Sequence, residues 1–217
     1  MQISINDLAT ELLRRVAKLS GTARIVVGVA GPPGVGKSTL CDQLNGLLNG
    51  KLPDIAAIFP MDGYHFDDNY LNQKGWRAQK GAPHTFDVGG FIHTLKRLKT
   101  NLEAFVAVPV FDREIEISRA GARVIPQEVR IILVEGNYLL LEQTPWDQVA
   151  GNFDLSVMLK AEPSEIERRL GARWGGYGLS PAEILEKLEV NDLPNVRNVM
   201  QNSAVPDYEI WTDRDPI

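Results

Sequence analysis

Apolar residues recur along this chain with two different periods, which predict helices and strands in alternation. Spacings of three and four predict an amphipathic helix over residues 5–19, with Asn6 as its cap. Similar spacings predict helices at residues 38–48, 90–99, 163–172, 180–190 and 194–202. Continuous apolar runs rich in β-branched residues predict strands at residues 24–30, 55–59, 105–110, 129–134, 154–159 and 208–211.

Two segments interrupt this alternation. Residues 67–90 are polar with little periodicity, so we expect a long loop with a functional role. Residues 113–117 and 123–125 alternate polar and apolar side chains, which predicts a β-hairpin with its turn at Ala120-Gly121. Strands that otherwise alternate with helices indicate an α/β fold, in which helices cover both faces of a mainly parallel sheet.

The strand predicted at residues 24–30 leads directly into a glycine-rich segment that matches the P-loop pattern G-x-x-x-x-G-K-[ST]. The segment consists of Gly31, Pro32, Pro33, Gly34, Val35, Gly36, Lys37, Ser38 and Thr39. A strand before it and a helix after it are the context this motif needs to bind phosphate groups at a helix N-terminus. We expect Lys37 to contact the β- and γ-phosphates and Ser38 to hold Mg²⁺.

Other polar residues also follow predicted strands. Asp62 comes after the strand at 55–59, Arg113 closes the run that follows 105–110, and Glu135 comes directly after 129–134. Because open parallel sheets bind ligands beyond the carboxyl ends of their strands, we expect these residues to line one crevice with the P-loop.

Composition narrows the class of partner. The 217 residues are 44% hydrophobic, which suits one domain with a full core. A net charge of −5 argues against a nucleic-acid partner, since phosphate backbones select basic surfaces. The single cysteine, Cys41, suits a reducing compartment, and no apolar run approaches the ~20 residues that span a bilayer. We therefore expect a cytoplasmic protein without a membrane or nucleic-acid partner.

The P-loop alone leaves several classes of enzyme open, among them GTPases, motor and transport ATPases, and small-molecule kinases. The chain lacks the Asn-Lys-x-Asp motif that reads guanine, and it lacks the second glycine-rich signature of transport ATPases. Its apolar strand ends in Glu135 instead of the Asp of a Walker B strand. The polar segment after Asp62 fits phosphoryl transfer to a small hydroxyl compound.

Four segments in combination resemble a known group of P-loop NTPases. They are the P-loop itself, Met61 to His65 (MDGYH), Lys80 to Asp87 (KGAPHTFD) and Val134 to Tyr138 (VEGNY). The chain resembles the uridine kinase, pantothenate kinase and phosphoribulokinase group over about residues 22–212. Within that group it is most similar to bacterial proteins labelled fructose transport system kinases or nucleoside/nucleotide kinase family proteins.

The resemblance implies catalytic roles for several positions. Asp62 matches the acidic residue taken as general base on the acceptor hydroxyl, a role that suits a carboxylate within hydrogen-bonding reach. Glu135 matches the acidic residue near Mg²⁺ or the acceptor. The group also has a mobile helical lid, here residues 163–180, in which Arg169 and Arg173 could neutralise charge on the transferred phosphoryl group. Uridine kinases carry an Arg-Asp pair in this lid, where the present chain has Arg173-Trp174.

Acceptor recognition is expected from residues 62–90 and 110–128. The candidate residues are Tyr64, His65, Arg77, His84, Asp87, Arg113, Glu135 and Asn137. His84 beside Pro83 and Asp87 before a predicted helix also fit capping roles.

Together these features predict an ATP- and Mg²⁺-dependent kinase of a small hydroxylated metabolite, with a sugar such as fructose ranked first. A nucleoside stays open as acceptor because Tyr64, Phe66, Trp76 and Phe86 could stack on a base. Pantothenate stays open because Arg77 or Arg113 could pair with its carboxylate. An ATP-binding regulatory protein without turnover is an alternative of another class, and a homodimer is also left open.

Overall fold

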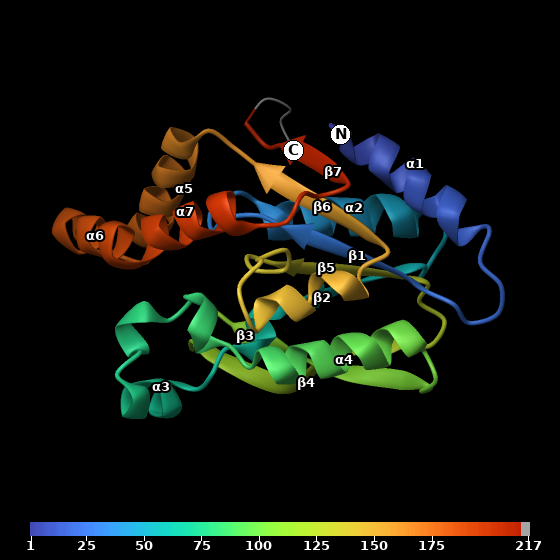
Figure 1. Cartoon of the computed structure of the whole chain (residues 1–217), viewed down its shortest axis with the longest axis horizontal. Helices are drawn as coiled ribbons and strands as arrows, with labels where there is room; N and C mark the ends of the chain where they lie inside the picture. Colours follow the sequence, from blue (N-terminus) through green and yellow to red (C-terminus); the bar gives the residue numbers. More distant parts are fainter. Residues whose placement is uncertain (214–217) are drawn as a thin grey trace.

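Five parallel strands form the central sheet, in the order β2-β5-β1-β6-β7 (Figure 1). The structure is a computed structural model that describes residues 1–213, so residues 214–217 of the expected domain lie outside it. The strands are β1 Ile25–Ala30, β2 Ala56–Pro60, β5 Ile131–Gly136, β6 Leu155–Lys160 and β7 Tyr208–Trp211. The predicted α/β fold with a mainly parallel sheet is confirmed.

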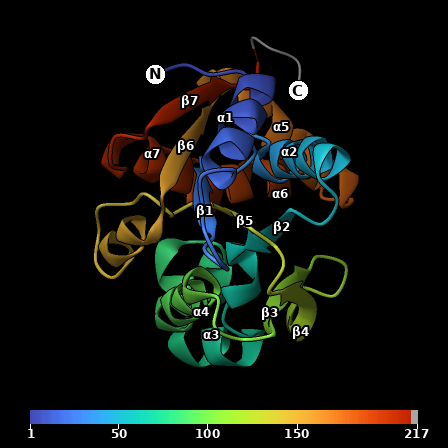
Figure 2. The same cartoon turned by 90° about the vertical axis from the view of Figure 1, so that its right-hand side faces the viewer.

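Alternate residues of β1 point into two separate hydrophobic cores. Val27 and Val29 pack with α1, α2 and α5. Val26 packs on the other face with α4 and with the strands β3 Phe105–Asp112 and β4 Ile117–Pro126. Figure 2 shows α1 and α2 on one side of the sheet and α4 with β3 and β4 on the other. These helices are α1 Ile5–Val16, α2 Lys37–Lys51, α4 Val88–Thr100 and α5 Pro163–Gly176. Burial of both faces stabilises the sheet at about 25 cal/mol per Å² of apolar surface.

The β-hairpin lies apart from the central sheet. It consists of β3 Phe105–Asp112 and β4 Ile117–Pro126, which pair antiparallel with each other. The turn predicted at Ala120-Gly121 is wrong, because the chain turns at residues 113–116 and Gly121 lies inside β4. Gly121 has φ 65° where β4 carries extra residues between Arg119 and Arg123, so the glycine marks a bulge instead of a turn.

Local helix signals account for two further differences from the predicted elements. Residues 67–90 contain the helix α3 Asp68–Lys74, which begins at an Asp67 cap and ends at Gly75 with φ 72°. Seven residues are too few for a helical period to be recognised in the sequence. Helix α1 is capped by Ser4, whose side chain accepts a hydrogen bond from the Asp7 N–H, and Asn6 lies inside the helix.

The C-terminal helices form one nearly continuous stretch. Helix α6 Pro181–Lys187, within the helix predicted at residues 180–190, begins with a capping box formed by Ser180 and Glu183. A π-helical turn, Leu188–Asp192, joins α6 to α7 Leu193–Asn202. In Figure 1 these orange and red helices lie above the green segment that contains α3. Within residues 1–213, no helix has the length and apolarity needed to cross a bilayer.

Candidate active site

A cleft of about 420 Å³ opens at the carboxyl ends of the sheet strands. Its lining comes from the P-loop, the turn after β2, the end of β5, the hairpin turn and the helices α5 to α7. Asp62, Arg113 and Glu135 therefore meet the P-loop in one place, although Arg113 arrives on the separate hairpin and not on a sheet strand.

The P-loop joins β1 to α2 through two glycines in the left-handed region. Gly34 has φ 78° and Gly36 has φ 98°, a backbone conformation that residues other than glycine rarely adopt. Lys37 opens α2, and its Nζ donates to the Pro32 carbonyl at 2.9 Å, so the side chain folds back over the loop. Burial lowers the pKa of Lys37 to about 8. A polyphosphate bound beside this amine would favour its charged form.

Ser38 and Glu135 bring two oxygens together at the end of the P-loop. The Ser38 hydroxyl donates to Oε2 of Glu135 at 2.7 Å, and burial raises the pKa of Glu135. Residues 1–213 contain no group of three or more His, Cys, Asp or Glu that could hold a metal on its own. Mg²⁺ that accompanies phosphates uses only one or two protein oxygens, so this pair fits such an ion.

Asp62 lies in the 3-10 turn Met61–Tyr64 and forms an ion pair with Arg113. Nη2 of Arg113 lies 2.8 Å from Oδ2 of Asp62, and their side chains are 44% and 30% exposed. Burial alone would raise the pKa of Asp62, but His65 and the cations Arg113 and Lys37 lower it below its usual value. Asp62 is therefore an ionised hydrogen-bond acceptor at neutral pH.

Gly63 allows the hairpin to pack tightly against this turn. A Cβ built on Gly63 would lie 2.6 Å from the carbonyl carbon of Pro109 in β3 and closer still to its oxygen. Only glycine permits this approach of two backbones.

His65 is held between two aromatic rings. Its ring centroid lies 4.0 Å from that of Phe86 and 4.7 Å from that of Phe111. Nδ1 lies 2.8 Å from the Asp62 carbonyl oxygen, which can only accept, so Nδ1 carries the proton. Burial lowers the pKa of His65, and the neutral ring then offers Nε2 as a hydrogen-bond acceptor.

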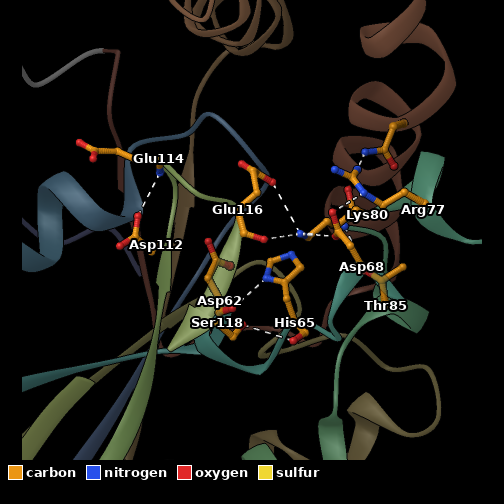
Figure 3. A network of polar contacts seen from close by, with 12 residues as sticks. Asp62, His65, Asp68, Arg77, Lys80, Thr85, Asp112, Glu114, Glu116 and Ser118 are labelled. Carbon is orange, nitrogen blue, oxygen red and sulfur yellow. Dashed lines mark hydrogen bonds and ion pairs between the residues drawn. The ribbon is translucent and has the colours of Figure 1, made fainter. Parts of the chain in front are cut away.

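Lys80 connects the segment around α3 to the hairpin turn (Figure 3). Its Nζ lies 2.7 Å from Oδ1 of Asp68 and 2.8 Å from the Glu116 carbonyl oxygen, and its side chain is only 7% exposed. Arg77 pairs with the other Asp68 oxygen at 2.7 Å. Sequence reasoning gave Lys80 no role, because its partners lie 12 and 36 residues away and no local pattern marks them.

The two arginines that the resemblance assigns to a lid, Arg169 and Arg173, differ in their contacts. Arg169 donates to the Val35 carbonyl at 3.2 Å, to Oγ1 of Thr212 at 2.9 Å, and to Glu165 at 2.7 Å. Arg173 lines the same cleft, has no hydrogen bond or ion pair within residues 1–213, and rests against the Trp174 ring at 5.3 Å. Arg173 is thus the one free to contact a ligand, whereas Arg169 braces the P-loop.

Other residues expected from the sequence divide between the cleft and its surroundings. Arg77 and Asn137 line the cleft. Tyr64 instead packs on Phe59 and Phe91 in the core, His84 lies edge-on to Trp76, and Asp87 caps α4 by accepting from the Gly90 N–H at 2.9 Å. The cleft also has lining residues that were not expected, namely Lys80, Phe111, Glu116, Lys187, Asn191, Asp192 and Asn195.

Comparison with known proteins gives full-length relatives among kinases. The Schizosaccharomyces pombe protein named "Putative uridine kinase C227.14" is 32% identical over 217 residues, covering 95% of this chain and 92% of the relative. A crystal structure from Silicibacter sp. TM1040, described as a "putative fructose transport system kinase", is 33% identical with a TM-score of 0.88, covering 96% of this chain and 99% of that one.

Two further matches cover only part of the chain. Pantothenate kinase of Latilactobacillus sakei is 35% identical over 145 residues, which is 66% of this chain and 47% of the relative. The family of the methylmalonyl Co-A mutase-associated GTPase MeaB matches only residues 2–65, a stretch that contains the P-loop. The chain belongs to the group of P-loop kinases that includes uridine kinases, pantothenate kinases and phosphoribulokinases, and it is a small-molecule kinase.

Proposed function

We propose that this kinase transfers the γ-phosphoryl group of ATP to a hydroxyl of a small sugar such as fructose. The observation that carries the proposal is the position of Asp62, an ionised carboxylate that lines the same cleft as Lys37 and Ser38. Phosphoryl transfer needs mainly positioning and charge neutralisation from the protein, and these residues supply both.

On the nucleotide side, the P-loop amides and Lys37 bind the phosphates, while Ser38 and Glu135 hold Mg²⁺. The Ser38 hydroxyl and the Glu135 carboxylate, 2.7 Å apart, are the hard oxygen ligands that this ion prefers. Mg²⁺ held by these two residues would supply positive charge that neutralises the charge developing on the phosphates. Arg173, which has no hydrogen bond or ion pair in the described part of the chain, contacts the transferred group from the lid.

On the acceptor side, Asp62 receives a hydrogen bond from the reacting hydroxyl. Oδ2 of Asp62 is held by Arg113, so the carboxylate is already oriented before the acceptor arrives. Because its pKa is lowered, Asp62 is a weak base that orients the hydroxyl first and accepts its proton late in the reaction. Arg113 then stays beside the carboxylate as its counter-charge.

The aromatic residues favour a sugar over a nucleoside. Of Tyr64, Phe66, Trp76 and Phe86, only Phe86 lines the cleft, and its ring is 4% exposed. Phe86 already packs against His65 and Tyr138, so it offers no open face on which a base could stack. The relative described as a fructose transport system kinase supports the same ranking. A nucleoside and pantothenate are the alternatives, in view of the relatives named for uridine and pantothenate.

The test is ADP release from ATP and Mg²⁺ with a panel of acceptors: fructose and other sugars, nucleosides, and pantothenate. Lys37→Ala serves as the blank, since it removes the phosphate-binding amine. Sugar-dependent ADP release that disappears in Lys37→Ala supports the proposal. Release that depends on a nucleoside or on pantothenate alone replaces the sugar with that acceptor. If no acceptor stimulates ADP release while ATP still binds, the proposed transfer is contradicted.

A further inference from the structure

One wall of the cleft consists of three polar residues to which the proposed function assigns no role. Asn191 and Asp192 belong to the π-helical turn and Asn195 to the first turn of α7; we call these three residues the π-turn wall. Each is only 7% exposed, and all three line the cleft. Nearly buried polar groups normally have hydrogen-bond partners, and π-helical turns occur frequently at functional sites.

Part of the hydrogen-bonding capacity of the wall is used within the protein. Nδ2 of Asn191 donates to the Lys80 carbonyl at 3.0 Å, and its Oδ1 accepts from Nδ2 of Asn195 at 3.1 Å. Oδ2 of Asp192 accepts from the Trp174 indole N–H at 2.6 Å. These contacts fix the orientation of all three side chains.

Two oxygens of the wall remain available to a ligand. Oδ1 of Asp192 and Oδ1 of Asn195 have no hydrogen-bond partner among residues 1–213. Among residues 1–213, neither oxygen is one of the fully buried side-chain atoms that lack a partner, so both retain access to solvent. Because both residues line the cleft, these oxygens are open to it, as is the second N–H of the Asn195 amide.

The wall lies on the acceptor side of the cleft. Asn191 donates a hydrogen bond to Lys80 and lies beside Gly81, both in the segment between Asp62 and α4. The hydrogen bond that the Asn191 side chain donates therefore goes to this segment and not to the P-loop. The Tyr138 hydroxyl donates to the Gly81 carbonyl at 2.6 Å from the other side. Burial raises the pKa of Tyr138, and the charges of Asp62 and Asp192 raise it further, so both carboxylates lie within electrostatic range of this one hydroxyl.

We propose that the π-turn wall is the subsite that binds the non-reacting hydroxyl groups of the acceptor, and that it selects an uncharged, polyhydroxylated molecule. The inference rests on the proposed sugar kinase function. A hydroxyl both donates and accepts, so it matches the Asn195 amide, and a neighbouring hydroxyl can donate to Asp192.

The surroundings of the wall disfavour other acceptors. The ring of Trp174, which donates to Asp192, is in contact with Nζ of Lys187 at 4.4 Å and with the Arg173 guanidinium at 5.3 Å, so a base would compete with these cations to stack on it. The open atoms Oδ1 of Asp192 and Oδ1 of Asn195 accept hydrogen bonds, so they match the hydroxyl groups of a sugar and not a carboxylate, which has no proton to donate. A sugar with several hydroxyls satisfies the open oxygens without either conflict.

The experiment measures steady-state kinetics with fructose, or with the sugar of the panel that gives the highest turnover if fructose gives none. In Asn195→Ala and Asp192→Asn we expect the KM for the sugar to rise about 10-fold or more, as for the loss of one net hydrogen bond. The KM for ATP should change less than about 2-fold, since the wall does not touch the P-loop. Asp192→Asn keeps an oxygen that can accept the hydrogen bond from Trp174, so a raised KM in this variant does not reflect loss of that structural contact. Asn202→Ala is the matched control, because it removes the same amide from the exposed end of α7.

Monodeoxy forms of the same sugar identify the contact. If Asn195 binds one hydroxyl, the sugar without that hydroxyl is a poor substrate of the wild type and loses nothing further in Asn195→Ala. Sugar turnover with an unchanged KM in both variants would overturn the inference while leaving the proposed function intact. If no sugar is phosphorylated, the proposed function fails and the wall loses its assigned ligand with it.

Discussion

The close contact between Gly63 and β3 predicts that a side chain at position 63 will displace the backbone. In Gly63→Ala the new methyl group would lie 2.6 Å from the Pro109 carbonyl carbon, 3.1 Å from the Val110 nitrogen, and nearer still to the Pro109 oxygen. All three are backbone atoms, so no side-chain rotation can relieve the overlap. Gly63 has no positive φ, so the substitution tests this packing contact alone.

The overlap must move either the Asp62 turn or the hairpin. Overpacking of this kind costs about 1–3 kcal/mol, and each 1 kcal/mol lowers Tm by roughly 2–4 °C in a chain of this size. For a cost of about 2 kcal/mol we expect Tm to fall by roughly 4–8 °C in a thermal melt. A shift of about 1 Å at Asp62 should also lower kcat by about 100-fold in the ADP-release assay.

Gly46→Ala is the control, because Gly46 lies inside α2 and a Cβ there meets nothing within 4 Å. Ala should stabilise that helix by about 0.5–1 kcal/mol, so the same change has opposite signs at the two positions. A Gly63→Ala protein with wild-type Tm and kcat would refute the described contact. A lower Tm with unchanged kcat would show that the contact does not position Asp62.

Four more predictions concern charged residues of the cleft. Asp62→Asn should lower kcat by about 10²–10⁴-fold while the Kd for ATP, measured by calorimetry, changes less than about 2-fold. The lowered pKa of Asp62 should keep this carboxylate ionised as pH falls to about 5, so activity lost above that pH would point to Glu135, whose pKa burial raises. Arg113→Ala removes a charge that lowers the pKa of Asp62 and should move the acidic limb of the kcat/KM profile to higher pH. Since the pKa of Lys37 is about 8, ATP binding to the free protein should weaken as pH rises through that value, and a flat calorimetric profile from pH 7 to 9 would contradict this. Arg173→Ala should lower kcat at least about 10-fold with little change in Tm. Arg169→Ala loses the hydrogen bonds to Val35 and Thr212, so it should lower Tm by several degrees. The reverse pattern would exchange the roles of the two arginines.

The elements that could be predicted from the sequence are those whose causes are local. The strand before Gly31, the helix after Lys37 and the capping box at Ser180 each depend on residues within a few positions of one another. Asp62 and Glu135 could be placed at the same crevice because parallel strands end at the same edge of a sheet.

The features that could not be predicted depend on residues far apart in the chain. Asn191 contacts Lys80 across 111 positions, and no sequence period marks either residue. The glycine at 121 has the same signature in a bulge as in a turn, so its neighbours in β3 decide between the two. Arg169 and Arg173 are one helical turn apart, and contacts with Val35 and Thr212, both distant in sequence, distinguish Arg169 from Arg173.

Among the described strands, β3 and β4 pair only with each other and share no ladder with the five-stranded sheet. The part of the protein that carries Arg113 is therefore joined to the part that carries the P-loop by side-chain packing and a few polar contacts, such as that of Arg123 with the Ile58 carbonyl. Insertions or a changed turn length at residues 113–116 should therefore leave the strand register of the five-stranded sheet undisturbed. Such modularity makes the hairpin tip, which carries the Arg113 partner of Asp62, the segment whose length can be varied first to test the proposed acceptor site.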